Sequence, residues 1–282
     1  MEIKALNSDN VSTYDGQLDP DVAESIGREF YRGIAAVDEA DDLKGAMIWE
    51  YKNLDEDAAT GSEIYLIKHG SKRILKDMLS EYGMQAKEYE VSNSYFELVD
   101  LPGEAVEALK ENGFEVTQGT GRDIELTVED LKPISVLKKK VASNVVALED
   151  LMELQFMQGV TTCIFNGKKG MVEDLEYIDK SWFDETTSGC VITDGRISGM
   201  LLVHRLSSGT LMPVLLNAIG PDSKMDLVNL MVFTARRALK KYPLENRILI
   251  RRHNVAVAAL AKKLFGTRQA PQVFRGIKGK ES

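Results

Sequence analysis

Two titratable side chains stand in apolar, strand-like runs, where they could take part in proton transfer. Glu50 follows the apolar run from Ala46 to Trp49. A carboxyl group that faces an apolar cleft has a raised pKa and can accept a proton near neutral pH. Glu50 also alternates with Trp49 and Tyr51, so the pattern fits the solvated face of a strand equally well. Glu50 is therefore a candidate catalytic base, with an ordinary surface carboxylate as the alternative.

His204 is the second candidate. It follows the apolar residues 201–203 and precedes Arg205. Imidazole changes its charge near neutral pH, so a histidine here could serve as a general base. A histidine at the end of a strand also commonly has a structural role, and the sequence leaves both interpretations open.

Two loops that contain glycine lead from an apolar strand into an amphipathic helix, which is a favourable place for an anion. The first N–H groups of a helix lack intrahelical acceptors, and the helix dipole attracts negative charge there. In the first loop, from Lys68 to Arg73, the candidate anion-binding residues are Gly70, Ser71 and Lys72. An ordinary helix cap with solvated lysines is the alternative.

The second loop has the same position before a longer helix, and its candidates are Asn217, Ala218, Ile219, Gly220, Ser223 and Lys224. Gly220 allows close backbone approach, and Lys224 could meet a phosphate. Pro221 lacks an N–H and Asp222 would repel an anion. We nevertheless expect the second loop to be the better cofactor site, because the net charge of its half of the chain suits a polyanion.

The elements that position these residues occur in a similar order twice. In the first half we expect a helix at 21–38, strands at 43–51 and 63–67, a helix at 71–82 ended by Gly83, a strand at 89–99, a helix at 103–112, and a strand pair at 114–117 and 124–128. In the second half we expect a helix at 148–157, a loop at 159–170, a hairpin of 189–193 and 197–206 around Asp194-Gly195, a strand at 211–219, a helix at 223–241, a strand at 246–251, a helix at 255–265 and a strand at 272–277.

A short repeat supports this duplication. The segments 105–114 and 256–265 are identical at five of ten positions. Chance similarity between two amphipathic helices is the alternative. Together with the element order, the repeat predicts two domains, at 1–132 and 133–282. Strands and helices alternate only in the later part of each half, so the fold class is α/β with mixed sheets.

The order of elements resembles the acyl-CoA N-acyltransferase fold of the GCN5-related N-acetyltransferases (GNAT), present as two tandem copies. The resemblance rests on element order and on the repeated helix, and it implies a central strand that splays from its neighbour to admit acyl-CoA. The two loops above would then hold the diphosphate of acetyl-CoA or another acyl-CoA. The family's usual pattern (Gln or Arg, two residues, Gly, one residue, Gly or Ala) is absent from both loops, so the motifs are degenerate.

The resemblance implies an N-acetyltransferase that moves an acyl group from acyl-CoA to an unidentified small-molecule or protein amine, with Glu50 or His204 as base. No tyrosine stands at the family's usual acid position, where Phe114 and Phe265 are found instead. A non-catalytic binding module that has lost the cofactor site is the main alternative. It predicts apolar or acidic side chains in the gap after Ala218.

Charge is divided unevenly along the chain. Residues 1–134 hold 30 acidic and 13 basic side chains, whereas residues 135–282 hold 14 acidic and 22 basic ones, which gives the overall net charge of −9. The basic C-terminal part suits a polyanion, and RNA binding is a weaker alternative function. The negative overall charge and the scarcity of aromatic residues among the basic ones count against RNA.

The composition excludes several other classes of protein. No apolar run reaches the 18 residues of a membrane span, and the first residues lack the pattern of a signal peptide. Cys163 and Cys190 have no metal-ligand spacing and fit a core in a reducing cytoplasm. We therefore expect a cytoplasmic protein without a metal site. The sequence does not determine its oligomeric state.

Overall fold

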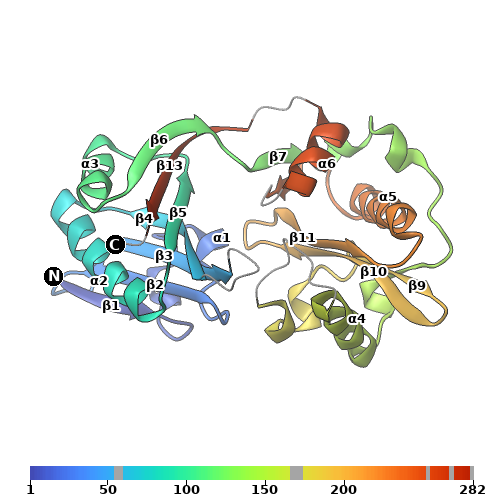
Figure 1. The fold of residues 1–282 in the computed structure, drawn as a ribbon, viewed down its shortest axis with the longest axis horizontal. Coiled ribbons are helices and arrows are strands. Elements are labelled where there is room, and N and C mark those ends of the chain that lie inside the picture. Colours follow the sequence, from blue (N-terminus) through green and yellow to red (C-terminus); the bar gives the residue numbers. More distant parts are fainter. Residues whose placement is uncertain (54–59, 166–173, 252–254, 267–269, 280–282) are drawn as a thin grey trace. The chain divides into compact units, whose positions relative to one another are not determined.

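The computed structural model describes residues 1–53, 60–165, 174–251, 255–266 and 270–279. The chain divides into two compact units, each considered separately below: unit 1 is Met1–Gly121 with Pro271–Ser282, and unit 2 is Arg122–Ala270. Figure 1 shows both units. This division differs from the expected boundary between residues 132 and 133, because residues 122–132 belong to unit 2 and the C-terminal strand belongs to unit 1.

Unit 1 is built on a mixed sheet with the strand order β1-β2-β3-β4-β5-β13-β6. Its strands are β1 (Glu2–Leu6), β2 (Tyr31–Val37), β3 (Leu43–Asn53), β4 (Thr60–Lys68), β5 (Asn93–Leu98), β6 (Glu115–Thr120) and β13 (Gln272–Gly279). Its helices are α1 (Pro20–Ala23), α2 (Lys72–Glu88), α3 (Gly103–Glu111) and the 3-10 turn η1 (Val11–Tyr14). One apolar core packs α2 and α3 on one face of the sheet, and a second core packs η1 and α1 on the other.

The helix expected over residues 21–38 is wrong. Only α1 is helical there, and Tyr31–Val37 forms β2 between β1 and β3. Ile34 and Val37 are at most 1% exposed because apolar layers cover both faces of this strand. A strand buried on both faces has a nearly continuous apolar run, which periodicity does not distinguish from a buried helix.

Helix α2 is longer than expected. It begins after Ser71, whose Oγ accepts a hydrogen bond from the N–H of Ile74 at 3.3 Å. It then continues through Gly83, where the sequence predicted its end, as far as Glu88. Buried residues on both sides of the glycine, from Leu75 to Ala86, hold the helix on the sheet. Tertiary packing therefore outweighs the unfavourable helix propensity of one glycine, about 1 kcal/mol.

The last strand of the chain completes the first sheet. β13 pairs antiparallel with β5 on one side and with β6 on the other. At Gly276 an added Cβ would lie 2.0 Å from Cε1 of Phe96, a fully buried ring, so only glycine fits there. The sequence predicted this strand but assigned it to the second half.

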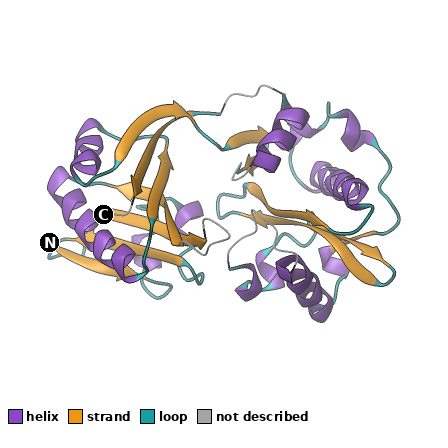
Figure 2. Cartoon of the chain, viewed as in Figure 1, coloured by secondary structure: helices purple, strands orange, loops and turns teal. Residues whose placement is uncertain are grey.

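Unit 2 contains a second mixed sheet with the order β7-β12-β11-β10-β9-β8. Its strands are β7 (Ile124–Thr127), β8 (Val145–Ala147), β9 (Gly189–Thr193), β10 (Arg196–Arg205), β11 (Leu211–Ala218) and β12 (Arg247–Ile250). Its α-helices are α4 (Glu153–Phe165), α5 (Ser223–Lys241) and α6 (Val255–Phe265), and its 3-10 turns are η2 (Val128–Leu131), η3 (Ser135–Lys138), η4 (Leu148–Asp150), η5 (Leu175–Tyr177) and η6 (Lys180–Trp182). Figure 2 shows helices on both faces of this sheet.

Two expectations for this region are corrected. β6 and β7 do not form the expected strand pair, since β6 pairs with β13 in unit 1 and β7 pairs with β12 in unit 2. The helix expected at 148–157 is α4, which starts at Glu153 and runs to Phe165 through part of the expected loop at 159–170. The rest of that loop lies outside the described residues.

The β9–β10 hairpin is confirmed. Its two-residue turn consists of Asp194 and Gly195, at φ values of 51° and 74°. Turns with positive φ at both central positions match the natural twist of a hairpin, and Asp-Gly is a favoured sequence for them. α5 is also confirmed at 223–241.

The sequence repeat identifies corresponding helices but not corresponding residues. α3 follows β5 in unit 1, and α6 follows β12 in unit 2. Ala108 is fully buried, whereas its matched residue Ala259 is exposed. The element order, rather than the identical residues, is what the two halves share. Among the described residues no helix is both long enough and apolar enough to cross a membrane.

Candidate functional site

In the sheet of unit 1, β4 and β5 diverge part of the way along their length. The two strands pair in parallel from Gly61 with Asn93 to Ile64 with Phe96. Beyond this point β4 stays paired with β3 as far as Lys68, and β5 stays paired with β13. Within the described residues, the facing edges of β4 and β5 therefore have no ladder pairing after Ile64.

A β-bulge lies where the strands diverge. Ile48 pairs with Leu66 and Trp49 pairs with Ile64, so Tyr65 is an extra residue on β4. A bulge bends its strand and changes the direction of a side chain, and bulges often occur beside active sites. Tyr65 is thus placed at the divergence point by the backbone itself.

Unit 2 repeats this geometry. Among the described residues, β11 and β12 pair in parallel only at Leu211 and Ile248, and β11 continues along β10 to Ala218. Its register shifts between Leu202 and Val203, which makes Val214 the extra residue. Both sheets thus have the divergence of central strands that the sequence led us to expect.

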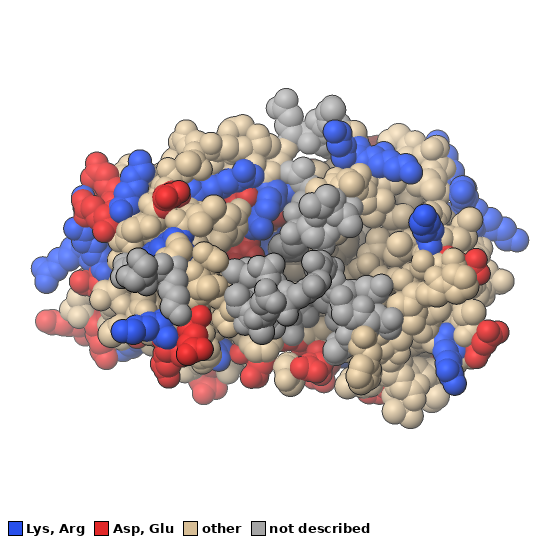
Figure 3. All heavy atoms as spheres, in the orientation of Figure 1, with Lys and Arg blue, Asp and Glu red and all other residues tan. Residues whose placement is uncertain are grey.

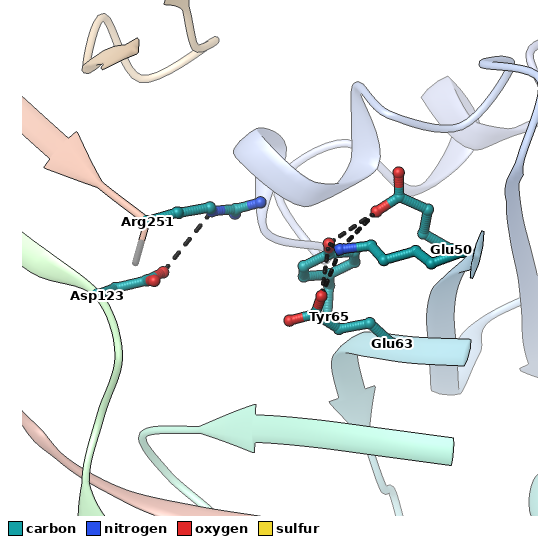
Figure 4. A network of polar contacts seen from close by, with 6 residues as sticks. Glu50, Glu63, Tyr65, Asp123 and Arg251 are labelled. Atoms are coloured by element: carbon teal, nitrogen blue, oxygen red, sulfur yellow. Dashed lines mark hydrogen bonds and ion pairs between the residues drawn. The ribbon is translucent and has the colours of Figure 1, made fainter. Parts of the chain in front are cut away.

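Four polar side chains of β3 and β4 meet at the divergence point in unit 1. Figure 4 shows the carboxylates of Glu50 and Glu63 and the hydroxyl of Tyr65 converging. The Tyr65 hydroxyl donates to Oε2 of Glu50 at 2.7 Å and lies 3.1 Å from Oε2 of Glu63. The ammonium of Lys52 lies 3.1 Å from Glu50, 2.5 Å from the Tyr65 oxygen, and also in contact with Glu63. We call Glu50, Lys52, Glu63 and Tyr65 the polar cluster.

The polar cluster is largely withdrawn from solvent. Glu50 is 3% exposed and Glu63 is 9% exposed. Burial alone would lower the pKa of Lys52, but the carboxylates of Glu63 and Glu50 outweigh it and raise that pKa above its usual value. Lys52 therefore stays a cation held between two carboxylates.

Glu50 was predicted as a candidate, and the structure places it in the polar cluster rather than alone among apolar residues. Sequence reasoning missed Lys52, Glu63 and Tyr65. A signal existed: Glu50 and Lys52 are two residues apart on one strand, as are Glu63 and Tyr65 on the next. Side chains two residues apart on a strand lie on the same face of the sheet. The sequence did not predict the pairing of β3 with β4 that brings Glu50 and Lys52 next to Glu63 and Tyr65.

His204 occupies the position in unit 2 that Glu50 has in unit 1. Counted from the bulge, Glu50 pairs with Glu63, and His204 pairs with Met212. The His204 ring stacks on Trp182 with centroids 3.5 Å apart, and Nδ1 lies 2.7 Å from the Trp182 carbonyl oxygen. A carbonyl only accepts, so Nδ1 carries the proton. These contacts fix the ring in place. The cross-strand neighbour of His204 is the apolar Met212, whereas that of Glu50 is the carboxylate Glu63.

The loop before α2 has features that suit an anion. Gly70 has a φ of +62°, and an added Cβ would lie 2.0 Å from the Lys44 carbonyl oxygen. Ser71 caps the helix through Ile74, so the N–H groups of the first turn that precede Ile74 still lack intrahelical acceptors. Lys72 lies at this end and pairs with Glu107 and Glu111 of α3. The three residues predicted here, Gly70, Ser71 and Lys72, therefore lie together at one helix start.

The loop before α5 is less suited to an anion than the sequence indicated. Asn217 and Ala218 are buried at the end of β11, whereas Gly220 and Lys224 are exposed. Asp222 is the N-cap residue of α5 without a side-chain capping bond, and Asp226 in the first turn is buried. Two carboxylates at a helix start repel a diphosphate.

The buried Asp226 gives a stability prediction. Burial and then the charge of Asp222 raise the pKa of Asp226, while a hydrogen bond from Ser198 opposes this. A carboxyl whose pKa is higher in the folded state than in the unfolded state destabilises the fold at pH values above both. Arg196 also lines the cavity beside Asp226.

We expect Asp226→Asn to raise the Tm of unit 2 at pH 7.5, on the order of 2 °C. The gain in Tm should shrink as the pH falls from above the raised pKa of Asp226 in the folded state to its ordinary pKa in the unfolded state, near 3.9. Differential scanning calorimetry at several pH values measures it. An equal gain at all pH values would contradict the assigned cause.

Several basic residues of the C-terminal region are paired with acidic ones. Arg237 contacts Glu149, Arg247 contacts Glu125, and Arg251 lies 3.6 Å from Asp123 (Figure 4). Acidic and basic side chains also lie side by side over unit 1 in Figure 3. These pairs reduce the free positive charge that RNA binding would need. Among the described residues no cluster of His, Cys, Asp or Glu is suited to a metal ion.

Known structures share this architecture. A tandem GNAT protein from the clavulanic acid biosynthesis pathway matches with a TM-score of 0.56 and 11% identity, over 100% of both chains. A GCN5-related N-acetyltransferase from Kribbella flavida also has a TM-score of 0.56 and 11% identity, over 96% of both chains. A GCN5-related glucosamine N-acetyltransferase region of a fungal multi-domain β-N-acetylglucosaminidase matches with a TM-score of 0.54 and 9% identity, over 98% of this chain and 38% of that one.

These likenesses show the fold alone: the chain has the mixed α/β fold of tandem GNAT proteins. The sequence itself matches no protein-family model and no curated protein. At such low identity the shared fold leaves the substrate and the activity to be argued from the site.

Proposed function

We propose that this chain, which has the tandem GNAT fold, transfers an acyl group from acyl-CoA to an amine, with the transfer centre in unit 1. The observation that carries the proposal is the position of the polar cluster. Two buried carboxylates and a tyrosine hydroxyl meet at the bulge where β4 leaves β5. Proton-transferring groups and a divergence of central strands thus coincide.

The residues of the polar cluster match the proton transfers of this reaction. An amine attacks a carbonyl carbon only after it loses its proton, and Glu63 or Glu50 can accept that proton. The C–N bond then forms, the C–S bond breaks, and the leaving sulfur takes up a proton, which the Tyr65 hydroxyl can donate. The new amide nitrogen releases its surplus proton, which restores the tyrosine hydroxyl. The Lys52 ammonium can stabilise negative charge that develops on nearby oxygen atoms during the transfer.

The start of α2 is the proposed diphosphate site. Gly70 and Ser71 precede the first N–H groups of the helix, and Lys72, which pairs with Glu107 and Glu111 of α3, lies beside them. Acyl-CoA, when bound, supplies the activated thioester carbonyl. The corresponding start of α5 carries Asp222 and the buried Asp226, so we now favour unit 1 over unit 2.

Two aspartate substitutions test the location. Ser71→Asp keeps a capping side chain at the start of α2 but adds a negative charge where the diphosphate would lie. Ser223→Asp adds the same charge at the start of α5. Isothermal titration of the full chain with acetyl-CoA and with CoA should show binding that Ser71→Asp weakens at least about tenfold and Ser223→Asp leaves unchanged.

The reverse pattern would move the site to unit 2. No binding of either ligand at millimolar concentration would refute the transferase. Release of free CoA thiol in the presence of a panel of primary amines then measures turnover.

A non-catalytic binding protein is the second candidate, and Lys52 is the observation that favours it. Its ammonium already occupies the space between Glu50 and Glu63, where an acceptor amine would have to lose its proton. The acidic residues at the start of α5 also agree with loss of a cofactor site in unit 2. Binding of CoA without turnover of any amine would select this candidate.

A further inference from the structure

Unit 2 contains a cavity that the proposed transfer reaction does not use. Its volume is about 630 Å³, which is within the range of small-molecule sites. The walls come from α4, from the tip of the β9–β10 hairpin, from the loop after β11 and from the first turn of α5. All of these elements belong to unit 2.

One side chain in this cavity is unusual. Asp226 is 6% exposed, and its closest hydrogen-bond donor among the described residues is the hydroxyl of Ser198, 3.5 Å from Oδ2. A hydrogen bond of that length is weak. A buried carboxylate normally has strong donors or a cation beside it.

The backbone places Ser198 at this position. The β9–β10 register shifts between Ile197 and Gly199, so Ser198 is a bulged residue. Its Oγ also lies 3.0 Å from Oγ1 of Thr193. Thr193, Ser198 and Asp226 thus form a short polar chain along one side of the cavity.

The remaining walls are mainly uncharged. Apolar side chains line much of the cavity, and they are Leu151, Ile192, Ile197, Ile219 and Pro221. Gln155 and Gln158 of α4 add amide groups. Asp222 adds a second carboxylate at the start of α5, and Arg196, which is exposed, adds a basic group.

We infer that this cavity binds an organic ammonium ligand, whose charged group pairs with Asp226 beside Asp222 and whose apolar part contacts Ile197 and Ile219. A primary ammonium has three donors and would supply the strong partner that Asp226 does not find among the described residues. The apolar walls favour a hydrocarbon body over a hydrated metal ion, which would need several more oxygen ligands. A diphosphate is disfavoured by both carboxylates. This inference does not depend on acyl transfer.

The test uses n-hexylamine as probe and 1-hexanol as its uncharged counterpart, titrated into the ¹⁵N-labelled full chain. Amide shifts should gather at residues 192–198 and 219–226 with n-hexylamine, and 1-hexanol should bind at least about tenfold more weakly. Asp226→Asn should weaken n-hexylamine at least about tenfold. Glu245→Gln, which removes one exposed charge beyond the far end of α5, should leave its affinity unchanged.

Equal affinity for the amine and the alcohol would overturn the inference, as would wild-type affinity in Asp226→Asn or shifts located elsewhere. Absence of binding would do the same. If ADP shifts these amides and n-hexylamine does not, the cavity is an anion site. Asp226→Asn is expected to be at least as stable as the wild type, so a loss of binding in a variant whose Tm is not lowered reports on the site rather than on folding.

Discussion

A chain that ends at Ala270 is expected to lose a folded unit 1. The truncation removes β13, which pairs with β5 and β6 over most of their length. It also removes Val273, which is 6% exposed, and uncovers the ring of Phe96. Loss of an interior strand leaves two unpaired strand edges and exposes part of the core. The resulting loss of stability should exceed the net stability of a typical domain, which is about 5–15 kcal/mol.

Calorimetry and hydrogen exchange of the truncated chain measure this outcome. Amides of β5 and β6 should lose protection, while those of β10 and β11 in unit 2 should keep it. A chain that ends at Gly279 keeps the whole of β13 and serves as the control. Retained protection in β5 of the truncated chain would show that unit 1 does not depend on its C-terminal strand.

A point substitution tests the packing of β13 without shortening the chain. Gly276→Val should destabilise unit 1 by about 3 kcal/mol or more, because even its Cβ would lie 2.0 Å from Phe96. In Gly279→Ala on the same strand, the added Cβ would meet only Asn93 Oδ1, at 3.7 Å. That variant should unfold close to the wild type.

Replacing Glu63 by glutamine is expected to lower the rate of acyl transfer by about 10²–10⁴-fold, the usual contribution of a positioned general base. The proposal assigns proton acceptance to Glu63 or Glu50, so the pair Glu63→Gln and Glu50→Gln identifies which one acts. The amide keeps the shape of the side chain. Measurements of kcat/KM for the most active amine, at several pH values, report the effect.

The controls distinguish catalysis from folding. Glu115→Gln removes an exposed carboxylate from β6 of the same unit and should not change kcat/KM. Tyr65→Phe should lower kcat most at high pH, where solvent supplies protons least readily to the leaving sulfur. If both glutamine variants keep wild-type rates and a normal Tm, the polar cluster is not the transfer centre.

Local sequence signals were sufficient where an element depends on its own residues. Asp194-Gly195 predicted the β9–β10 hairpin, because few sequences adopt positive φ at two consecutive positions. Pro102 and Gly113 framed α3, which spans Gly103–Glu111. The two tandem copies were also readable, from the order of elements rather than from the identical residues of the repeat.

The candidate site was only half readable. Glu50 could be selected as a carboxyl group in an apolar strand, but its partner Glu63 is joined to it by the pairing of β3 with β4. That register includes the bulge at Tyr65, and no local pattern predicts where an extra residue is accommodated. The burial of Asp226, which makes the second loop a less favourable place for an anion, depends on the fold around it and could not be predicted.

By itself, the sequence determined the class of the fold, its duplication, and most strands and helices, since these follow from residue spacing and turn residues within about twenty positions. Only the tertiary structure decided that β13 closes unit 1, that β7 belongs to unit 2, and that Tyr31–Val37 is a strand. Each of these depends on hydrogen-bond partners far away along the chain. The apolar pattern of a strand predicts which of its faces are buried, but not which neighbouring strands it pairs with.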